Sequence, residues 1–255
     1  MDITRETSIW SEDYPVATCD ADYHGGMFIH QLCRLFQEAA HRHADHLGVG
    51  YQFLTANQMA WVLLSLRIEV KRYPRWDETI TVQTWPSNRD RLYYYRDFRI
   101  LDGAAESIVR AVTKWLVTDV ERRIPQKTEN IVEFRFNLQP TQFPEWVDKI
   151  VPWGLLEPFS GFRVDYTDLD LNLHLNNTRY IERVMAAYPR EFLDHMTLRE
   201  LDVNFLAEAQ YGDEVVIEKV DPVEGQHLLT LTKQADGKEV CRMRLRWERM
   251  ASGQV

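Results

Sequence analysis

Apolar and polar positions follow the same order twice along this chain. In the first half, apolar residues recur with helical spacing between residues 27 and 47, at positions that include Leu32, Phe36 and Ala39. Gly48 marks a stop for this predicted helix. Runs rich in Val, Ile, Thr, Tyr and Trp predict strands before and after it, at residues 8–18, 60–72, 78–86, 92–102 and 106–119.

The second half repeats this order around a shorter helix. A helix is expected over residues 176–188, and strands are expected at 161–166, 197–208, 213–221, 226–235 and 238–249. Four prolines between the halves interrupt the periodicity, which is typical of a connecting segment: Pro140, Pro144, Pro152 and Pro158. We therefore predict two α+β units, each an antiparallel sheet that wraps a central helix, at residues 1–138 and 161–255 with a linker at 139–160.

Two short motifs support a duplication. Asp22-Tyr23-His24 before the long helix corresponds to Asp170-Leu171-Asn172 before the shorter one. Trp76-Asp77-Glu78 before a strand corresponds to Gly212-Asp213-Glu214 before a strand. The two units are therefore expected to share turns as well as strands and helices.

The stretch DLDLNLHLNNTRY, residues 168–180, is the most informative for chemistry. Asp170, Asn172 and His174 recur at every second position, and Asn176-Asn177 follow at the expected helix start. Such alternation places a carboxylate, a carboxamide and an imidazole on one side of an extended segment. Backbone N–H groups at a helix start are unpaired and attract developing negative charge. The pattern predicts an acyl-transfer or acyl-hydrolysis site rather than a polar helix cap alone.

Composition excludes several other classes of function. The 255 residues carry a formal net charge of −9, which argues against general nucleic-acid binding because that needs a basic surface. No apolar run reaches the ~18 residues of a membrane span, and the acidic N-terminus resembles neither a signal nor a transit peptide. Three widely spaced cysteines favour a reducing compartment. We expect a cytoplasmic protein with no nucleic-acid or membrane partner.

Other reactive residues have ordinary contexts. Glu208 lies at the end of a predicted strand, where an exposed carboxylate is common. None of the cysteines, Cys19, Cys33 and Cys241, has a His or Asn neighbour in sequence. The histidines at 41, 43 and 46 do not share one helical face, so we expect no metal site there. No phosphate-binding glycine loop or serine elbow is present, and no cofactor is expected.

Basic residues gather in four places despite the negative net charge. Each basic group is compatible with an ordinary solvated surface, but on a chain of net negative charge one of them could bind an acidic partner. They are Lys71-Arg72-Arg75, then Arg89-Arg91-Arg96, then Arg122-Arg123-Lys127, and the alternating Arg242, Arg244 and Arg246 on the final strand.

In these motifs the sequence resembles the acyl-acyl-carrier-protein (acyl-ACP) thioesterases, both the plant type and their bacterial relatives, over most of its length. The second-half run from Asp170 to Ile181 is highly specific. The first-half motifs are individually weak but arrive in the family's order, namely Trp61-Val62, Tyr73-Pro74-Arg75-Trp76, Thr84-Trp85, Arg96-Asp97-Phe98, Trp115 and Arg122-Arg123-Ile124-Pro125.

The resemblance implies a tandem of two hot-dog domains and a role in fatty acid biosynthesis. Carried over by position, the catalytic residues are Asp170, Asn172, His174 and Glu208, the last because the family's Glu lies 34 residues beyond its His. Plant members have a Cys after this Glu, whereas this chain has Ala209, which places a cysteine mechanism in doubt.

The first unit is expected to be chemically silent and to hold the acyl chain. Counting back from the matching turns puts Arg72 at the place of Glu208. Asn176 and Asn177 are assigned to substrate binding beside the catalytic residues. The acyl tunnel is expected to be lined by residues that core packing would explain equally well, namely Met27, Leu35, Ala39, Met59 and Trp61.

The implied reaction is hydrolysis of a fatty acyl thioester on the pantetheine arm of acyl carrier protein (ACP), an acidic partner. Glu208 with Asn172 would activate water, while His174 and a backbone N–H would hold the oxyanion. Direct attack by a carboxylate, with an anhydride intermediate, stays open. Three other functions also stay open, namely acyl-coenzyme A hydrolysis, dehydration of 3-hydroxyacyl thioesters and non-catalytic acyl binding. The sequence does not determine the chain-length preference or whether the protein forms a homodimer.

Overall fold

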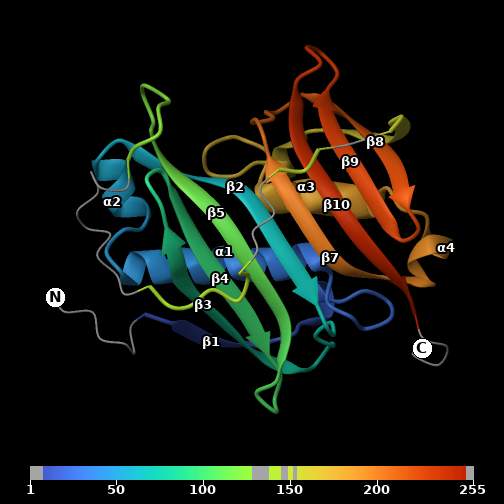
Figure 1. Ribbon diagram of the computed structural model, residues 1–255, viewed down its shortest axis with the longest axis horizontal. Helices are drawn as coiled ribbons and strands as arrows, with labels where there is room; N and C mark the ends of the chain where they lie inside the picture. The colour runs from blue at the N-terminus through green and yellow to red at the C-terminus, as the bar shows by residue number, and fades with distance from the viewer. Residues whose placement is uncertain (1–7, 128–137, 145–148, 152–153, 251–255) are drawn as a thin grey trace. The chain divides into compact units, whose positions relative to one another are not determined.

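The chain folds as two units, residues 1–146 and 147–255, shown in a computed structural model (Figure 1). The structure describes residues 8–127, 138–144, 149–151 and 154–250. The division falls within the stretch 139–160 that the prolines predict as a linker, of which residues 145–148 and 152–153 lie outside the described residues. Among the described residues, no helix is long and apolar enough to cross a membrane.

Unit 1 is an antiparallel sheet with its long helix packed on one face (Figure 1). The strand order is β1-β3-β4-β5-β2. Its elements are β1 (Trp10–Pro15), α1 (Ile29–His46), α2 (Tyr51–Ala56), β2 (Met59–Val70), β3 (Thr79–Arg89), β4 (Tyr93–Leu101) and β5 (Ser107–Asp119). The predicted long helix and all predicted strands of the first half are therefore present.

Side chains of α1 and β4 meet in the core of unit 1. The buried face of α1 includes Leu32, Phe36, Ala39 and Ala40, at the helical spacing seen in the sequence. Phe36 meets Phe98 of β4 with ring centroids 4.9 Å apart. Burial of one such aromatic side chain stabilises the folded state by about 3 kcal/mol. The periodicity of α1 thus fixes which face of the sheet it covers.

Unit 2 repeats the arrangement with a shorter helix. Its strand order is β7-β10-β9-β8-β6. Its elements are β6 (Glu157–Arg163), α3 (Asn177–Ala186), α4 (Arg190–Leu193), β7 (Met196–Phe205), β8 (Glu214–Val223), β9 (Gln226–Lys233) and β10 (Glu239–Arg249). The buried face of α3 includes Tyr180, Ile181 and Val184. The α+β duplication predicted from the sequence is confirmed.

The structure differs from the sequence expectation at three short elements. Helices α2 and α4 were not predicted, because glycines and a proline close beside them signal turns. Strand β6 begins at Glu157 rather than at residue 161. Pro158 suggested a loop, but a proline is tolerated on an edge strand, and β6 is the edge strand of unit 2.

An aromatic cluster under α4 encloses a histidine. The hydroxyl of Tyr188 and Nδ1 of His227 lie 2.7 Å apart, and the two rings stack with centroids 5.5 Å apart. Phe192 and Trp247 pack against the same imidazole. Burial lowers the pKa of His227 to about 4, although Asp221 nearby acts in the opposite direction. The imidazole is therefore neutral in the folded protein at neutral pH.

We predict that acidification destabilises unit 2 through His227. Between pH 6.5 and about pH 4 the unfolded chain binds the proton more readily than the folded chain. The free energy of unfolding therefore falls, by up to about 1.4 kcal/mol per pH unit, as pH drops below 6.5. Urea unfolding at about pH 7 and about pH 5 measures this, with His227→Phe as the comparison. An equal pH dependence in His227→Phe would contradict the assignment.

Candidate active site

The polar motif of unit 2 forms a tight loop around one carboxylate. Oδ1 of Asp170 accepts hydrogen bonds from the backbone N–H groups of Asn172 (2.8 Å) and His174 (3.1 Å). The Asp170 N–H in turn donates to the His174 carbonyl at 2.8 Å. Leu173 within the loop has a φ of +64°, a left-handed conformation that is costly for a branched side chain. Asp170 therefore shapes the loop that carries His174.

Backbone pairing brings His174 and Glu208 together. The Leu175 N–H donates to the Ala209 carbonyl at 2.8 Å, and His174 forms an isolated bridge with Gln210. As a result Nε2 of His174 lies 3.3 Å from Oε2 of Glu208. The imidazole is 23% exposed and the carboxylate 49% exposed. An acid–base pair thus faces solvent, where a substrate can reach it.

The asparagines of the motif occupy different positions. Asn172 is exposed, and within the described part of the chain its carboxamide forms no hydrogen bond, so it is not held against Glu208. Asn176 caps α3, where its side-chain oxygen accepts from the N–H and the hydroxyl of Thr178, both at 2.9 Å. Asn177 is the first residue of the helix. The capping role explains Asn176 without a substrate.

The start of α3 leaves one backbone donor uncommitted. The N–H groups of residues 172–176, 178 and 179 donate to Asp170, Ala209, Asp168 and Asn176. Among the described residues, the Asn177 N–H has no acceptor. Unpaired N–H groups at a helix start stabilise negative charge. Asn177 therefore supplies the candidate donor for an oxyanion at this loop.

Tyr180 supports the segment that carries Glu208, a role that the sequence did not reveal. Its side chain is 2% exposed, and its ring meets that of Phe205 at 5.9 Å. Burial raises the pKa of its phenol, while a hydrogen bond with the Ala209 backbone acts the other way. In the sequence, its only signal was its place in the family motif that runs from Asp170 to Ile181.

Unit 1 contains the same loop without a histidine–glutamate pair. Oδ1 of Asp22 accepts from the N–H groups of His24 (2.9 Å) and Gly26 (3.0 Å), as Asp170 does from Asn172 and His174. The Met27 N–H donates to the Pro74 carbonyl, as Leu175 does to Ala209. Gly26 therefore stands where unit 2 has His174.

This correspondence corrects the residue that replaces Glu208 in unit 1. Because Pro74 matches Ala209, the counterpart of Glu208 is Tyr73, and the expectation of Arg72 was off by one position. Asp77 and Gly212 are the matching turn residues, with φ of +66° and +87°. Arg72 instead pairs with Glu78 at 2.8 Å.

The described residues offer no activated thiol beside His174. Cys33 and Cys241 are buried, and burial raises the pKa of both thiols. Cys19 is exposed but belongs to unit 1. Ala209, the neighbour of Glu208, is fully buried. Among the described residues, no group of three or more His, Cys, Asp or Glu side chains is placed to hold a metal ion.

The residues predicted to line an acyl tunnel lie in unit 1. Met27 and Ala39 are buried, and Leu35 on α1 is half-buried. Met59 and Trp61 are partly buried and pack against a core cluster that contains Ala44, Leu54 and Tyr94. Trp61 meets Tyr94 edge-on with ring centroids 5.1 Å apart.

Family models match both units. Residues 7–134 match the acyl-ACP thioesterase N-terminal domain and residues 157–249 match the acyl-ACP thioesterase C-terminal domain. An oleoyl-ACP thioesterase of Arabidopsis thaliana is 25% identical over 95% of this chain and 77% of its own length. A palmitoyl-ACP thioesterase of Cuphea hookeriana is 30% identical over 74% of this chain and 48% of its own. The chain thus spans about three quarters of the first of these chloroplastic relatives and about half of the second.

Solved structures agree with the fold. An acyl-ACP thioesterase from Bacteroides thetaiotaomicron matches with a TM-score of 0.86 and 26% identity over 96% of this chain and 100% of its own. The 12:0-ACP thioesterase of Umbellularia californica has a TM-score of 0.83 at 18% identity, over 95% and 98% of the two chains, and supports the fold alone. The tandem hot-dog expectation is confirmed. This chain belongs to the acyl-ACP thioesterase family and is a thioester hydrolase.

Proposed function

We propose that this protein hydrolyses the thioester of a fatty acyl chain carried on ACP and releases the free fatty acid. The observation that carries the proposal is the contact of 3.3 Å between His174 and Glu208 on a solvent-facing loop of unit 2. Family membership supplies the reaction class. Three free cysteines fit a reducing, cytoplasmic setting.

In the proposed reaction Glu208 acts as general base. Its carboxylate takes a proton from a water molecule, positioned with the exposed carboxamide of Asn172, as the water oxygen attacks the thioester carbonyl carbon. The negative charge that develops on the carbonyl oxygen is held by His174 and the Asn177 N–H. The carbon–sulfur bond then breaks, and the leaving thiolate of the pantetheine arm takes the proton back from Glu208. The products are a carboxylic acid and a thiol.

Asp170 acts in this scheme as a positioning residue. Its carboxylate is committed to two backbone N–H groups of its own loop. Asp22 makes the same hydrogen bonds in unit 1, where Gly26 and Tyr73 replace the reactive pair. Because the aspartate makes these hydrogen bonds even in the unit that lacks the histidine and the glutamate, its role is to hold the loop conformation rather than to contact the substrate.

Charge pairing narrows the candidate docking surface for acidic ACP. Arg72 pairs with Glu78 and Asp102, Arg244 with Asp202, and Arg246 with Glu200. These contacts offset the charge of two of the four basic groups. In the described part of the chain, the side chains of Arg91 and Arg122 form no ion pair, and both are exposed.

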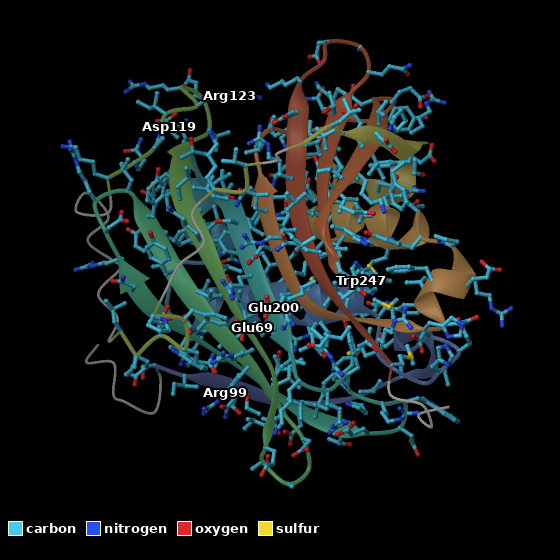
Figure 2. All side chains as sticks on the ribbon, turned by 45° about the vertical axis from the view of Figure 1, so that its right-hand side comes forward. Glu69, Arg99, Asp119, Arg123, Glu200 and Trp247 are labelled. Carbon is cyan, nitrogen blue, oxygen red and sulfur yellow. The ribbon has the colours of Figure 1, made fainter. Side chains whose placement is uncertain are left out.

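The hairpin that carries Arg91 and the turn that carries Arg122 share one end of the unit 1 sheet. Tyr93 pairs with Leu116, so the β3–β4 hairpin lies beside the end of β5. Figure 2 shows Asp119 at the end of β5 and Arg123 on the turn that follows. Val120 and Ile124 on this turn are 55% and 49% exposed. Exposed apolar side chains near Arg91 and Arg122 suit a protein partner of negative charge.

Replacing Glu208 by Gln should lower kcat by roughly 100-fold to 10,000-fold with little change in KM, because the base is lost and the shape kept. Thiol release from acyl-ACP measures both constants. Glu214→Gln is the matched control, since Glu214 is also an exposed carboxylate of unit 2. An unaltered kcat in Glu208→Gln would remove Glu208 from the mechanism.

Alkylation should leave activity intact. Only Cys19 is exposed, so the native protein should incorporate one alkyl group, located by mass spectrometry, and retain its kcat. Replacement of Cys19 by Ala should likewise retain kcat. Loss of activity that tracks modification of Cys33 or Cys241 would instead point to a thiol mechanism.

Reversing the charge of Arg91 and Arg122 together, as Arg91→Glu and Arg122→Glu, should raise KM for acyl-ACP by ~10-fold or more and weaken its dependence on salt. The KM for the matching acyl-coenzyme A and both kcat values should stay unchanged. Arg34→Glu, an exposed arginine on α1, is the control. Equal KM values for acyl-ACP in the variant and the wild type would place docking elsewhere.

A further inference from the structure

The α1–β4 seam of unit 1 contains a cation between two apolar clusters. Along β4, Tyr94, Arg96 and Phe98 all contact α1 or pack beside it. Tyr94 joins the cluster of Ala44 and Leu54, and Phe98 meets Phe36. Arg96 therefore lies between these two apolar groups, beside His43 and Thr84.

The guanidinium of Arg96 contacts no carboxylate among the described residues. Its Nη1 lies 2.9 Å from Nδ1 of His43 and 3.2 Å from the hydroxyl of Thr84. The adjacent Asp97 directs its carboxylate to the Gln142 N–H and the Thr141 hydroxyl. Buried charges are ordinarily paired with an opposite charge. This one is not paired.

Arg96 lies deep in unit 1 and still reaches solvent. Burial lowers the pKa of its guanidinium to about 10. His43 beside it is fully buried. The Arg96 side chain nevertheless remains partly exposed. Ala39, one turn before His43 on the buried face of α1, is a predicted acyl contact on the same seam.

We propose that Arg96, held by His43 and Thr84, is a specificity-determining residue that ends the acyl pocket of unit 1. The inference rests on the proposed function. Each methylene that enters an apolar pocket favours binding roughly fourfold. An alkyl terminus that reaches Arg96 reverses this gain, because it displaces water from a cation and offers no acceptor. A chain whose terminus carries a hydroxyl group is not penalised in this way.

The test uses the full-length protein and the variant Arg96→Met. Saturated acyl-ACP substrates of graded length are supplied as a mixture, and the released fatty acids are quantified. For chains longer than the wild-type optimum, the rate relative to the optimum should rise ~10-fold or more. At the first length that wild type rejects, the ω-hydroxyacyl chain should exceed the alkyl chain in wild type but not in Arg96→Met.

Three further variants separate specificity from folding. Arg99→Met is the matched control, because Arg99 (labelled in Figure 2) lies on the same strand. Its side chain instead contacts Gln83 and the ring of Trp85. It should retain the wild-type length profile, as should Arg96→Lys, which keeps the charge. Arg96→Gln, which keeps a polar side chain without charge, should shift toward longer chains. Ratios between substrates are independent of the fraction of folded enzyme.

Two results would overturn the inference while the proposed function stands. One is a wild-type length profile in folded, active Arg96→Met and Arg96→Gln. The other is loss of folding in both variants by circular dichroism, which would make Arg96 a structural residue. A wild-type protein that releases no fatty acid from any acyl-ACP would instead refute the proposed function, and this inference with it.

Discussion

The site of unit 2 depends on the hydrogen bond from the Leu175 N–H to the Ala209 carbonyl. This contact joins the loop before α3 to the segment that follows β7, and so fixes the separation of His174 and Glu208. His174 and Glu208 lie on segments that are far apart in the sequence, so the position of one side chain relative to the other depends on the backbone hydrogen bond that joins these segments. Two further contacts hold these segments. Tyr180 forms a hydrogen bond with the Ala209 backbone, and Asp170 accepts one from the His174 N–H.

Comparison of the two units separates scaffold from chemistry. Both retain an aspartate that gathers loop N–H groups, and both retain the bond from the residue before the helix cap to the second segment. Only unit 2 adds the imidazole and the carboxylate. Leu173 also differs, since Gly25 occupies the equivalent left-handed position in unit 1 without strain. The loop of unit 2 therefore retains a conformational cost that the loop of unit 1 avoids.

The spacing of apolar residues was enough to predict most of the helices and strands. The helical spacing around Phe36 and the alternating strands needed no tertiary information, because amphipathic elements bury the face that their sequence defines. The sequence did not predict helix α2, because it is one short segment between Gly50 and Gln58. Contacts of Leu54 with the core stabilise it, rather than local helix propensity.

The site was less accessible to sequence reasoning. Asp170, Asn172 and His174 stood out by spacing, but spacing could not show that Asp170 turns inward to its own backbone while Asn172 faces solvent. Glu208 emerged only through the family resemblance, since a strand-end glutamate has no local signal. Arg96 and Arg99 look alike in sequence, and only the fold places one against α1 and the other against Trp85.

The loop at Asp22 makes unit 1 a ready frame for protein engineering. A Cβ built at Gly26 would meet its nearest neighbours, Tyr73 and Asp22, at 3.7 and 3.8 Å, which is ordinary van der Waals contact. A histidine there, with glutamate in place of Tyr73, would recreate the local arrangement of the reactive pair by two substitutions. Unit 1 thus retains the backbone of the loop that carries His174 in unit 2, without its imidazole and carboxylate.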